Sequence, residues 1–297
     1  MFRSARYALL IACGVVASAA FGADRDWSKV AEALDKKGSM QPDGVYRVGL
    51  PRTDLKVSLD GVALKPNFAL GGWLAFEPMG NETMMMGDLV LTESEINPVI
   101  SKLLAEGLQV TAVHNHLLRA TPPTFYMHVA GKGDAEQLAR RMHNAIEQSK
   151  TPLGLNIAAP KTSPELGIET TAIDQLIGAK GHNNGGVYQY SLIRPDDIKQ
   201  GGMTIPAGMG SAIGINFQPT SADKAAITGD FVALASEVNP LIKALRDNDI
   251  EVTAIHNHML DDEPRVFFIH FWANDDAMKL ATGLRAALDV LRIVPRR

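Results

Sequence analysis

Six of the eight histidines occupy matched positions in two segments of the chain. They are His114, His116 and His128, followed 142 residues later by His256, His258 and His270. In a β-strand, alternate side chains point to the same face, so each His-Asn-His motif presents two imidazoles together. A turn centred on Pro122 would place His128 opposite His116, and the equivalent turn at Pro264 would place His270 opposite His258. Cross-strand neighbours have Cβ atoms about 4.5–5.5 Å apart.

Three converging imidazoles are the ligand set of an open zinc site, which keeps a fourth position for water. The sequence therefore predicts a divalent metal, with zinc favoured, bound by three histidines in each repeat. The soft side chains of Met84, Met85 and Met86 make copper an alternative. A hydrogen-bonded structural cluster or a metal-free ligand site is the other interpretation. It must accept the cost of burying several ionisable rings without a cation.

Three glutamates are candidate catalytic residues. Glu95 and Glu237 stand just before the Asn-Pro pairs that are expected to begin a helix in each repeat. The helix dipole favours a carboxylate there, and a metal ligand or a general base is the alternative role. Glu263 lies in the acidic turn of the second repeat, where it would add an oxygen ligand or a base. The matching turn of the first repeat carries Arg119, which would hold an anionic group, unless both turns are simply solvated.

The matched histidines belong to a tandem duplication. Gly-Val-Tyr, Gly-Asp, Glu-x-Asn-Pro and Val-Thr-Ala motifs also recur at the same offset. The repeats are expected over residues 27–149 and 169–291, joined by a proline-containing linker over 150–168. Asp88 and Asp230, in the Gly-Asp pairs, are interpreted as turn or sheet residues. The pairs Arg52–Asp54 and Arg194–Asp196 are interpreted as structural ion pairs.

Each repeat has the same predicted elements. A first helix is followed by short strands, a helix beginning at Asn97-Pro98, a histidine-bearing hairpin over 109–117 and 124–130, and a last helix over 134–148. Val99, Ile100, Leu103 and Leu104 form the apolar face of the middle helix, and Leu138, Met142 and Ile146 that of the last. This order predicts an α/β or α+β fold, with a mixed sheet and packed helices in each repeat.

The first residues are expected to be a secretory signal peptide over 1–22. Basic residues precede an apolar run that ends in small residues. The run is too short to span a bilayer comfortably, and no other segment is suitable. The mature protein would be periplasmic or secreted. It would instead be anchored by lipid at Cys13 if residues 10–13, which resemble a lipoprotein cleavage motif, are the cleavage site. Cys13 is the only cysteine, so a thiolate ligand is excluded on the soluble interpretation. Net charge is −4 without a basic run, which argues against nucleic acid as a partner.

The repeated Glu-x-Asn-Pro and His-Asn-His motifs, with the later Met127-His128 and Ile269-His270, resemble the LppY/LpqO family of exported bacterial proteins and lipoproteins. The resemblance covers nearly the whole mature chain and implies export and duplication, without a reaction. Cupins also use a His-x-His motif, but their flanking glycines are missing here and the predicted helices do not fit a β-barrel.

Three functions follow from these observations. The first is an exported metal-binding protein with its molecular role unassigned. The second is a metal-dependent hydrolase or lyase acting on a small substrate through a metal-bound water. The third is a small-ligand-binding protein with structural histidines. Sequence alone leaves open whether the two triads form separate sites or meet at the repeat interface.

Overall fold

The computed structural model describes residues 26–155, 163–291 and 293. The expected signal peptide, Cys13 and part of the expected linker lie outside these residues. In the first repeat the chain forms α1 (Trp27–Leu34), β1 (Ser39–Met40), β2 (Tyr46–Pro51), β3 (Ser58–Leu59), β4 (Val62–Ala63), α2 (Pro66–Ala69), β5 (Gly71–Met79), β6 (Glu82–Thr92), α3 (Glu93–Ala105), β7 (Gln109–His114), β8 (Thr124–Gly133) and α4 (Ala135–Ile146).

The second repeat follows the same plan. It forms α5 (Thr170–Ile177), β9 (His182–Asn184), β10 (Val187–Leu192), β11 (Lys199–Gln200), β12 (Met203–Thr204), the 3-10 helix η1 (Ala207–Met209), β13 (Ile213–Ser221), β14 (Lys224–Leu234), α6 (Val238–Arg246), β15 (Glu251–His256), β16 (Asp262–Glu263), β17 (Val266–Asp276) and α7 (Ala277–Leu291). No helix among the described residues is long and apolar enough to cross a membrane.

Each repeat is an α+β unit built on a six-stranded sheet. The strand orders are β1-β2-β5-β6-β8-β7 and β15-β17-β14-β13-β10-β9. All the strand pairs of these two sheets are antiparallel, so neither is the mixed sheet that was predicted. Short connections between successive strands favour antiparallel pairing, since parallel pairs need long crossovers.

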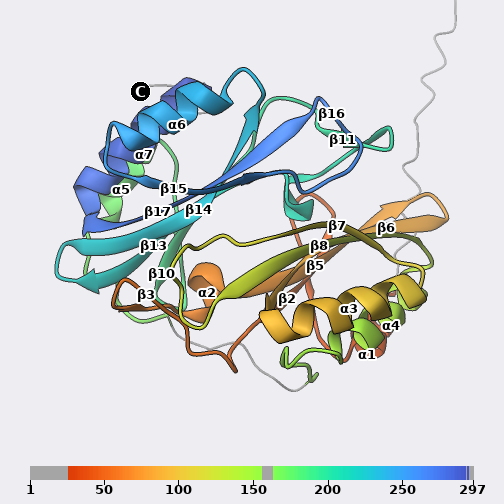
Figure 1. Cartoon of the computed structure of the whole chain (residues 1–297). Helices are drawn as coiled ribbons and strands as arrows, with labels where there is room; N and C mark the ends of the chain where they lie inside the picture. The colour runs from red at the N-terminus through yellow and green to blue at the C-terminus, as the bar shows by residue number, and fades with distance from the viewer. Residues whose placement is uncertain (1–25, 156–162, 292, 294–297) are drawn as a thin grey trace, which may run out of the picture.

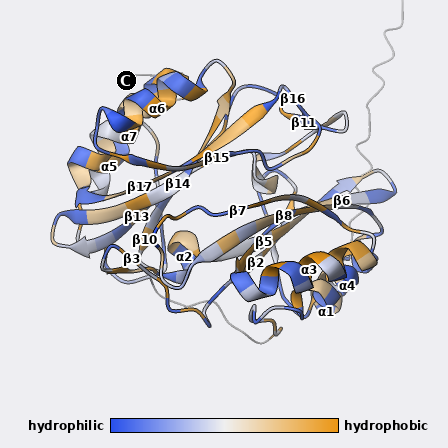
Figure 2. Cartoon of the chain, viewed as in Figure 1, coloured by the Kyte–Doolittle hydropathy of each residue, from blue (hydrophilic) through white to orange (hydrophobic). Residues whose placement is uncertain are grey.

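The two sheets face each other, and the helices cover their outer sides (Figure 1). The layers are therefore helix, sheet, sheet and helix. Hydrophilic and hydrophobic residues both appear along the outer helices in Figure 2, as expected for helices that bury one stripe. Leu138, Met142 and Ile146 are buried as predicted. In α3, Val99 and Leu103 are buried, whereas Leu104 is 61% exposed and does not belong to the buried face.

The middle helix of the first repeat begins earlier than predicted. Thr92 is its N-cap, and its backbone N–H donates to Glu95 at 2.8 Å, which is a capping-box contact. Asn97 is therefore not the cap, and Pro98 lies inside the helix near its start. In the second repeat the N-cap is Glu237, whose carboxylate also reaches back to the backbone N–H of Leu234.

Apolar side chains from both repeats pack together between the sheets. One core cluster joins Val45, Ala75 and Met86 of the first repeat to residues such as Ile215 of the second. Another joins Phe68 and Val90 to Trp272 in the same way. The repeat interface is thus part of the hydrophobic core, which fixes the two inner sheet faces relative to one another.

Candidate metal centre at the repeat interface

The histidines lie at the ends of matching strands on the inner sheet faces. His114 ends β7, His116 follows in the loop, and His128 lies within β8. The second repeat places His256, His258 and His270 in the same way on and after β15 and in β17. All six sequence-predicted histidines are therefore brought to one place.

The predicted hairpin register is wrong, however. His128 pairs with Ala112 and His114 pairs with Tyr126, so His116 lies beyond the last pair of the ladder. A register shift between Val110 and Ala112 moves the pairing, and the second repeat has the same shift, so that His270 pairs with Ala254. A bulge of this kind adds one unpaired residue and cannot be read from strand alternation.

The consequence is that the histidines pair between the repeats. The rings of His114 and His256 stack with centroids 3.4 Å apart. Those of His116 and His270 are 3.6 Å apart, and those of His128 and His258 are 3.7 Å apart. Each close pair takes one member from each repeat. The sequence left open whether the two triads are separate or meet, and the structure brings them together in one shared cluster at the repeat interface.

Three sets of ligand atoms lie within 4.8 Å of one another. They are His114, His116, His256 and His270; His114, His128 and His258; and Asp230, His258 and His270. Exchange of the two repeats converts His116 and His270 of the first set into His258 and His128 of the second. The second set differs in that it lacks His256. His114 belongs to both of these sets, and the third set joins Asp230 to one histidine from each of them. Such shared ligands are suited to two neighbouring ions.

Most of the ring nitrogens in this cluster are buried without a hydrogen-bond partner. These atoms are Nδ1 and Nε2 of His114 and Nε2 of His116, His128, His256, His258 and His270. An unsatisfied buried donor or acceptor is costly, and native proteins contain few of them. A metal ion would satisfy the lone pairs of these nitrogens, which lie close together. The six histidines therefore fit a bound metal ion.

Burial also determines the charge of these rings. It lowers the pKa of His114 to about 3 and that of His256 to about 4, with the neighbouring imidazole adding to the effect at His114. The pKa values of the other four are held well below the usual range, mainly by burial. All six imidazoles are consequently neutral near pH 7, which is the state that binds metal.

Two aspartates lie within the cluster, although the sequence interpretation treated them as turn or sheet residues. Asp88 in β6 pairs with His128, and Asp230 in β14 pairs with His270. Asp88 Oδ1 is 4.0 Å from His128 Nε2 and has no hydrogen-bond partner. Burial raises the pKa of Asp230 to about 7, and burial with the nearby charge of Asp230 raises that of Asp88 well above its usual range. Their matched Gly-Asp motifs were the signal that could have identified them.

Glu95 and Glu237 belong to a different structure. Arg52 is completely buried and donates to both Asp54 and Glu95, each at 2.8 Å. Arg194 repeats this arrangement with Asp196 and Glu237. The predicted Arg–Asp ion pairs are confirmed, and each is extended to a triad by the glutamate. Neither glutamate is among the ligand sets, because its carboxylate is held by the arginine.

The turn residues that were candidates for ligand or substrate binding also lie elsewhere. Glu263 is exposed in β16, where it pairs with Lys199. The neighbouring Asp262 accepts from the backbone of Val266 at 2.7 Å. Arg119 is exposed and forms ion pairs with Asp60 and with Glu251 of the second repeat. The first turn thus helps to join the repeats.

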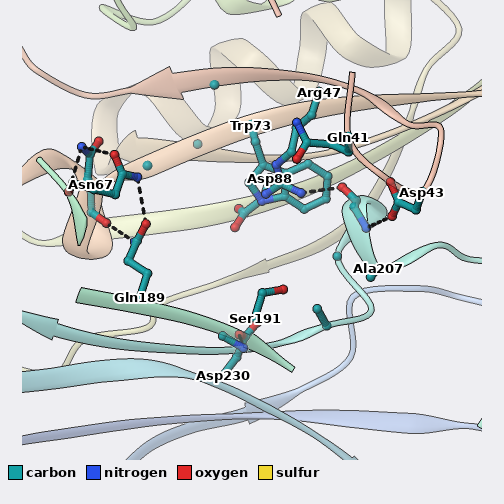
Figure 3. Close-up of a pocket in the computed structure, with 18 of the residues that line it drawn as sticks. Gln41, Asp43, Arg47, Asn67, Trp73, Asp88, Gln189, Ser191, Ala207 and Asp230 are labelled. Carbon is teal, nitrogen blue, oxygen red and sulfur yellow. Dashed lines mark hydrogen bonds between the residues drawn. The ribbon is translucent and has the colours of Figure 1, made fainter. Parts of the chain in front are cut away.

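A cavity of about 750 Å³ reaches the cluster from between the sheets, and His128, His258, Asp88 and Asp230 line part of it. Figure 3 shows Arg47 and Trp73 on the wall formed by the first repeat, with Gln189 and Ser191 on the opposite wall. A smaller cavity of about 200 Å³ reaches His116 and His270. The pairs His128–His258 and His116–His270 therefore border open space in which a ligand would fit.

The architecture and the site define a duplicated α+β protein with a histidine cluster between its repeats. Its sequence matches the family model described as Domain of Unknown Function (DUF1259) over residues 28–148 and again over 171–290. The chain belongs to this DUF1259 family, in two tandem copies. No curated protein matches the sequence significantly.

Three solved structures match the chain at low sequence identity and low TM-score. The trimeric bacterial microcompartment shell protein PduB has 11% identity and a TM-score of 0.21, with 86% of this chain and 90% of that one covered. EtuB from Clostridium kluyveri has 10% identity and the same TM-score, over 87% and 92%. A double-ringed trimeric shell protein of the RMM microcompartment has 10% identity and a TM-score of 0.21, over 72% and 85%.

Proposed function

We propose that this chain is an exported metal-binding protein whose two repeats jointly hold two divalent ions. The observation that carries the proposal is the set of buried, unpartnered imidazole nitrogens contributed by both repeats. Neutral imidazoles with an adjacent carboxylate suit zinc, and the set of His114, His128 and His258 leaves a fourth coordination position open. Met84, Met85 and Met86 pack in the hydrophobic cores, so the donor set around the cluster is nitrogen and oxygen, which favours zinc over copper(I).

Under this proposal, one ion lies at His116 and His270 and the other at His128 and His258. His114 belongs to both ligand sets, and His256 belongs to the set of His116 and His270. The backbone carbonyl of Gly229 accepts from Nδ1 of His270 at 2.9 Å. That contact fixes the ring and leaves Nε2 for the ion, as second-shell partners of metal-bound histidines commonly do.

Elemental analysis of double variants tests both the metal and its arrangement. The protein is purified without chelator and reconstituted with zinc. We expect wild type to hold two ions, and His116→Ala/His270→Ala or His128→Ala/His258→Ala to lose one ion each. The same-repeat variant His116→Ala/His128→Ala should lose both. His143→Ala/His182→Ala, outside the cluster, is the matched control.

Each other outcome has a definite meaning. If the same-repeat variant loses one ion while the cross-repeat variants lose both, the ions are held by separate triads. If wild type holds no zinc, copper or other divalent metal after reconstitution, the proposal is wrong. A metal-free ligand-binding protein with structural histidines would then replace it.

A metal-dependent hydrolase or lyase is a second candidate function, and the cavity favours it. His128 and His258 line a space large enough for a small substrate, so a metal-bound water there would face a bound molecule. Zinc-loaded protein should then release 4-nitrophenol from its acetate or phosphate ester. Loss of that release in His128→Ala/His258→Ala would support the hydrolase, and equal rates in both proteins would reject it for these esters.

Export and the finer family relationship are also proposals. The motifs that resemble LppY/LpqO proteins, and the basic and apolar leader, support secretion to the periplasm or beyond. Mass spectrometry of the mature protein distinguishes cleavage near residue 22 from a lipid-modified Cys13. A protein that retains Met1–Phe21 in the soluble cell fraction would contradict export.

A further inference from the structure

Arg47 is an enclosed cation beside the metal centre. It lies on β2, and its guanidinium carbon is 4.1 Å from the centre of the Trp73 ring, which holds it in a cation–π contact. Nη1 donates to the backbone carbonyl of Gly208 in the second repeat. Among the described residues, no carboxylate forms an ion pair with this guanidinium. A buried charge is normally paired, so the group is ready for an anionic partner.

The acidic groups near Arg47 are directed elsewhere. The carboxylate of Asp43 accepts from the backbone N–H of Gly208 at 2.7 Å. Asp88 lies against His128, and Asp230 accepts from the backbone of Gly214 at 3.2 Å. Ions held by the histidines would offset the charge of both of these aspartates. Asp88, Asp230 and Asp43 thus act on the charge of Arg47 without forming an ion pair with it, and its guanidinium lines this end of the cavity.

The two repeats differ at this point, although they agree at the cluster. Arg47 corresponds to Gln189, and Trp73, which pairs with Asp88, corresponds to Gly214, which pairs with Asp230. Gln189 is already occupied, because its amide donates to Asn67 and to Asn216, each at 2.8 Å. Among the residues that the structure describes, Arg47 of the first repeat is the one arginine or lysine that lines the cavity. This asymmetry indicates that one ligand binds across the interface in a single orientation.

We infer that Arg47 binds the carboxylate or phosphate group of a small organic anion whose remainder lies in the cavity toward His128 and His258. The planar guanidinium forms paired, charge-assisted hydrogen bonds to either kind of oxyanion. A volume of about 750 Å³ accommodates such a molecule. The inference extends the proposed function by naming the ligand class of the same site.

Calorimetric titration with inorganic phosphate and with succinate tests this inference, on zinc-loaded and on chelator-treated protein. Arg47→Gln introduces the residue found in the other repeat. We expect it to weaken binding of at least one anion about ten- to a hundredfold, since hydrogen bonds to a charged group contribute about 1.5–3 kcal/mol. Arg47→Lys should bind the anion with intermediate affinity, because it keeps the positive charge and loses the paired hydrogen bonds of the guanidinium. Arg119→Gln removes an exposed cation that does not line the cavity and is the matched control.

The two anions separate a phosphate-preferring site from a carboxylate-preferring one. Wild type that binds neither anion, or Arg47→Gln that binds both as tightly as wild type, overturns the inference. Metal content and circular dichroism of Arg47→Gln show that the variant is folded and loaded. Arg47-dependent binding in a protein that holds no metal would reject the proposed function and retain the inference. Two bound ions together with anion binding that does not depend on Arg47 would support the proposed function and overturn the inference.

Discussion

Acidification should destabilise the metal-free protein through its six buried imidazoles. The folded state holds His114 at a pKa of about 3 and His256 at about 4, whereas an exposed histidine in the unfolded chain has the ordinary value of 6.5. As the pH falls below that ordinary value, the unfolded chain takes up protons that the folded cluster refuses. The stability contributed by the neutral rings is therefore complete above it and is lost progressively down to the folded pKa values.

The magnitude follows from these differences. At about pH 5, each ring that stays neutral in the folded state lowers the free energy of unfolding by about 2 kcal/mol relative to neutral pH. One pKa unit corresponds to about 1.4 kcal/mol. His114 and His256 together account for about 4 kcal/mol, and the other four histidines add to the same loss. Asp88 and Asp230 act in the opposite direction, because their raised pKa values let the folded state take up protons first. The histidines outnumber them, and a domain typically has about 5–15 kcal/mol in total.

Urea unfolding with a chelator, followed by tryptophan fluorescence at about pH 7.5, 6 and 5, measures this loss. The double variant His114→Gln/His256→Gln should lose about 4 kcal/mol less than wild type between about pH 7.5 and 5. Taking the difference between the two proteins removes the contribution of the aspartates. His143→Gln, outside the cluster, is the control. The reasoning is refuted if wild type and the double variant have the same pH dependence.

Three further perturbations test the surrounding structure. Arg52→Met should lower the free energy of urea unfolding by about 3–5 kcal/mol, because it leaves Asp54 and Glu95 without their buried cation. Arg140→Met on the surface should lower it by less than about 1 kcal/mol. Equal losses in the two variants would contradict a buried triad. Gly229→Ala should prevent stable folding, since its Cβ would lie 1.9 Å from the carbonyl oxygen of Gly214, while Gly49→Ala meets nothing within 4 Å and should leave the melting temperature unchanged. Arg119→Ala should cost less than about 1 kcal/mol and leave the metal content unchanged, because its ion pairs are exposed; loss of metal would mean that this contact positions the repeats.

The internal repeat allowed much of the fold to be predicted. Matched motifs at one offset divided the chain into two similar units, and their periodicity indicated strands, a histidine hairpin and amphipathic helices. Helix starts were less predictable, because Thr92 and Glu95 cap α3 before the Asn97-Pro98 signal is reached. The strand ladder was predicted with the wrong register, because the bulge at Val110–Ala112 leaves no mark in the alternation of side chains.

The membership of the site was predicted better than its geometry. Residue type and duplication identified all six histidines. The pairing of His116 with His270 depends on how two sheet faces dock, and a repeat pattern carries no information about that. Asp88 and Asp230 were missed because a Gly-Asp pair also fits an ordinary turn. Arg47 was missed because Gln189 occupies its position in the second repeat, so it is not one of the residues that match between the repeats.

The shared cluster has a consequence for how the two repeats stay together. Neither repeat alone brings His116 close to His270 or His128 close to His258, so the two ligand sets that contain His114 exist only in the docked state. Ions that bind the docked state alone stabilise it in proportion to the logarithm of their concentration over Kd. The same ions would bind the unpartnered imidazole nitrogens that destabilise the metal-free interface. Retention of identical histidines by both repeats then has a physical reason, because a change in one repeat damages a site to which the other contributes. Arg47 and Gln189 face the cavity outside the ligand sets, so these positions were free to diverge and to give the interface one preferred orientation for its ligand.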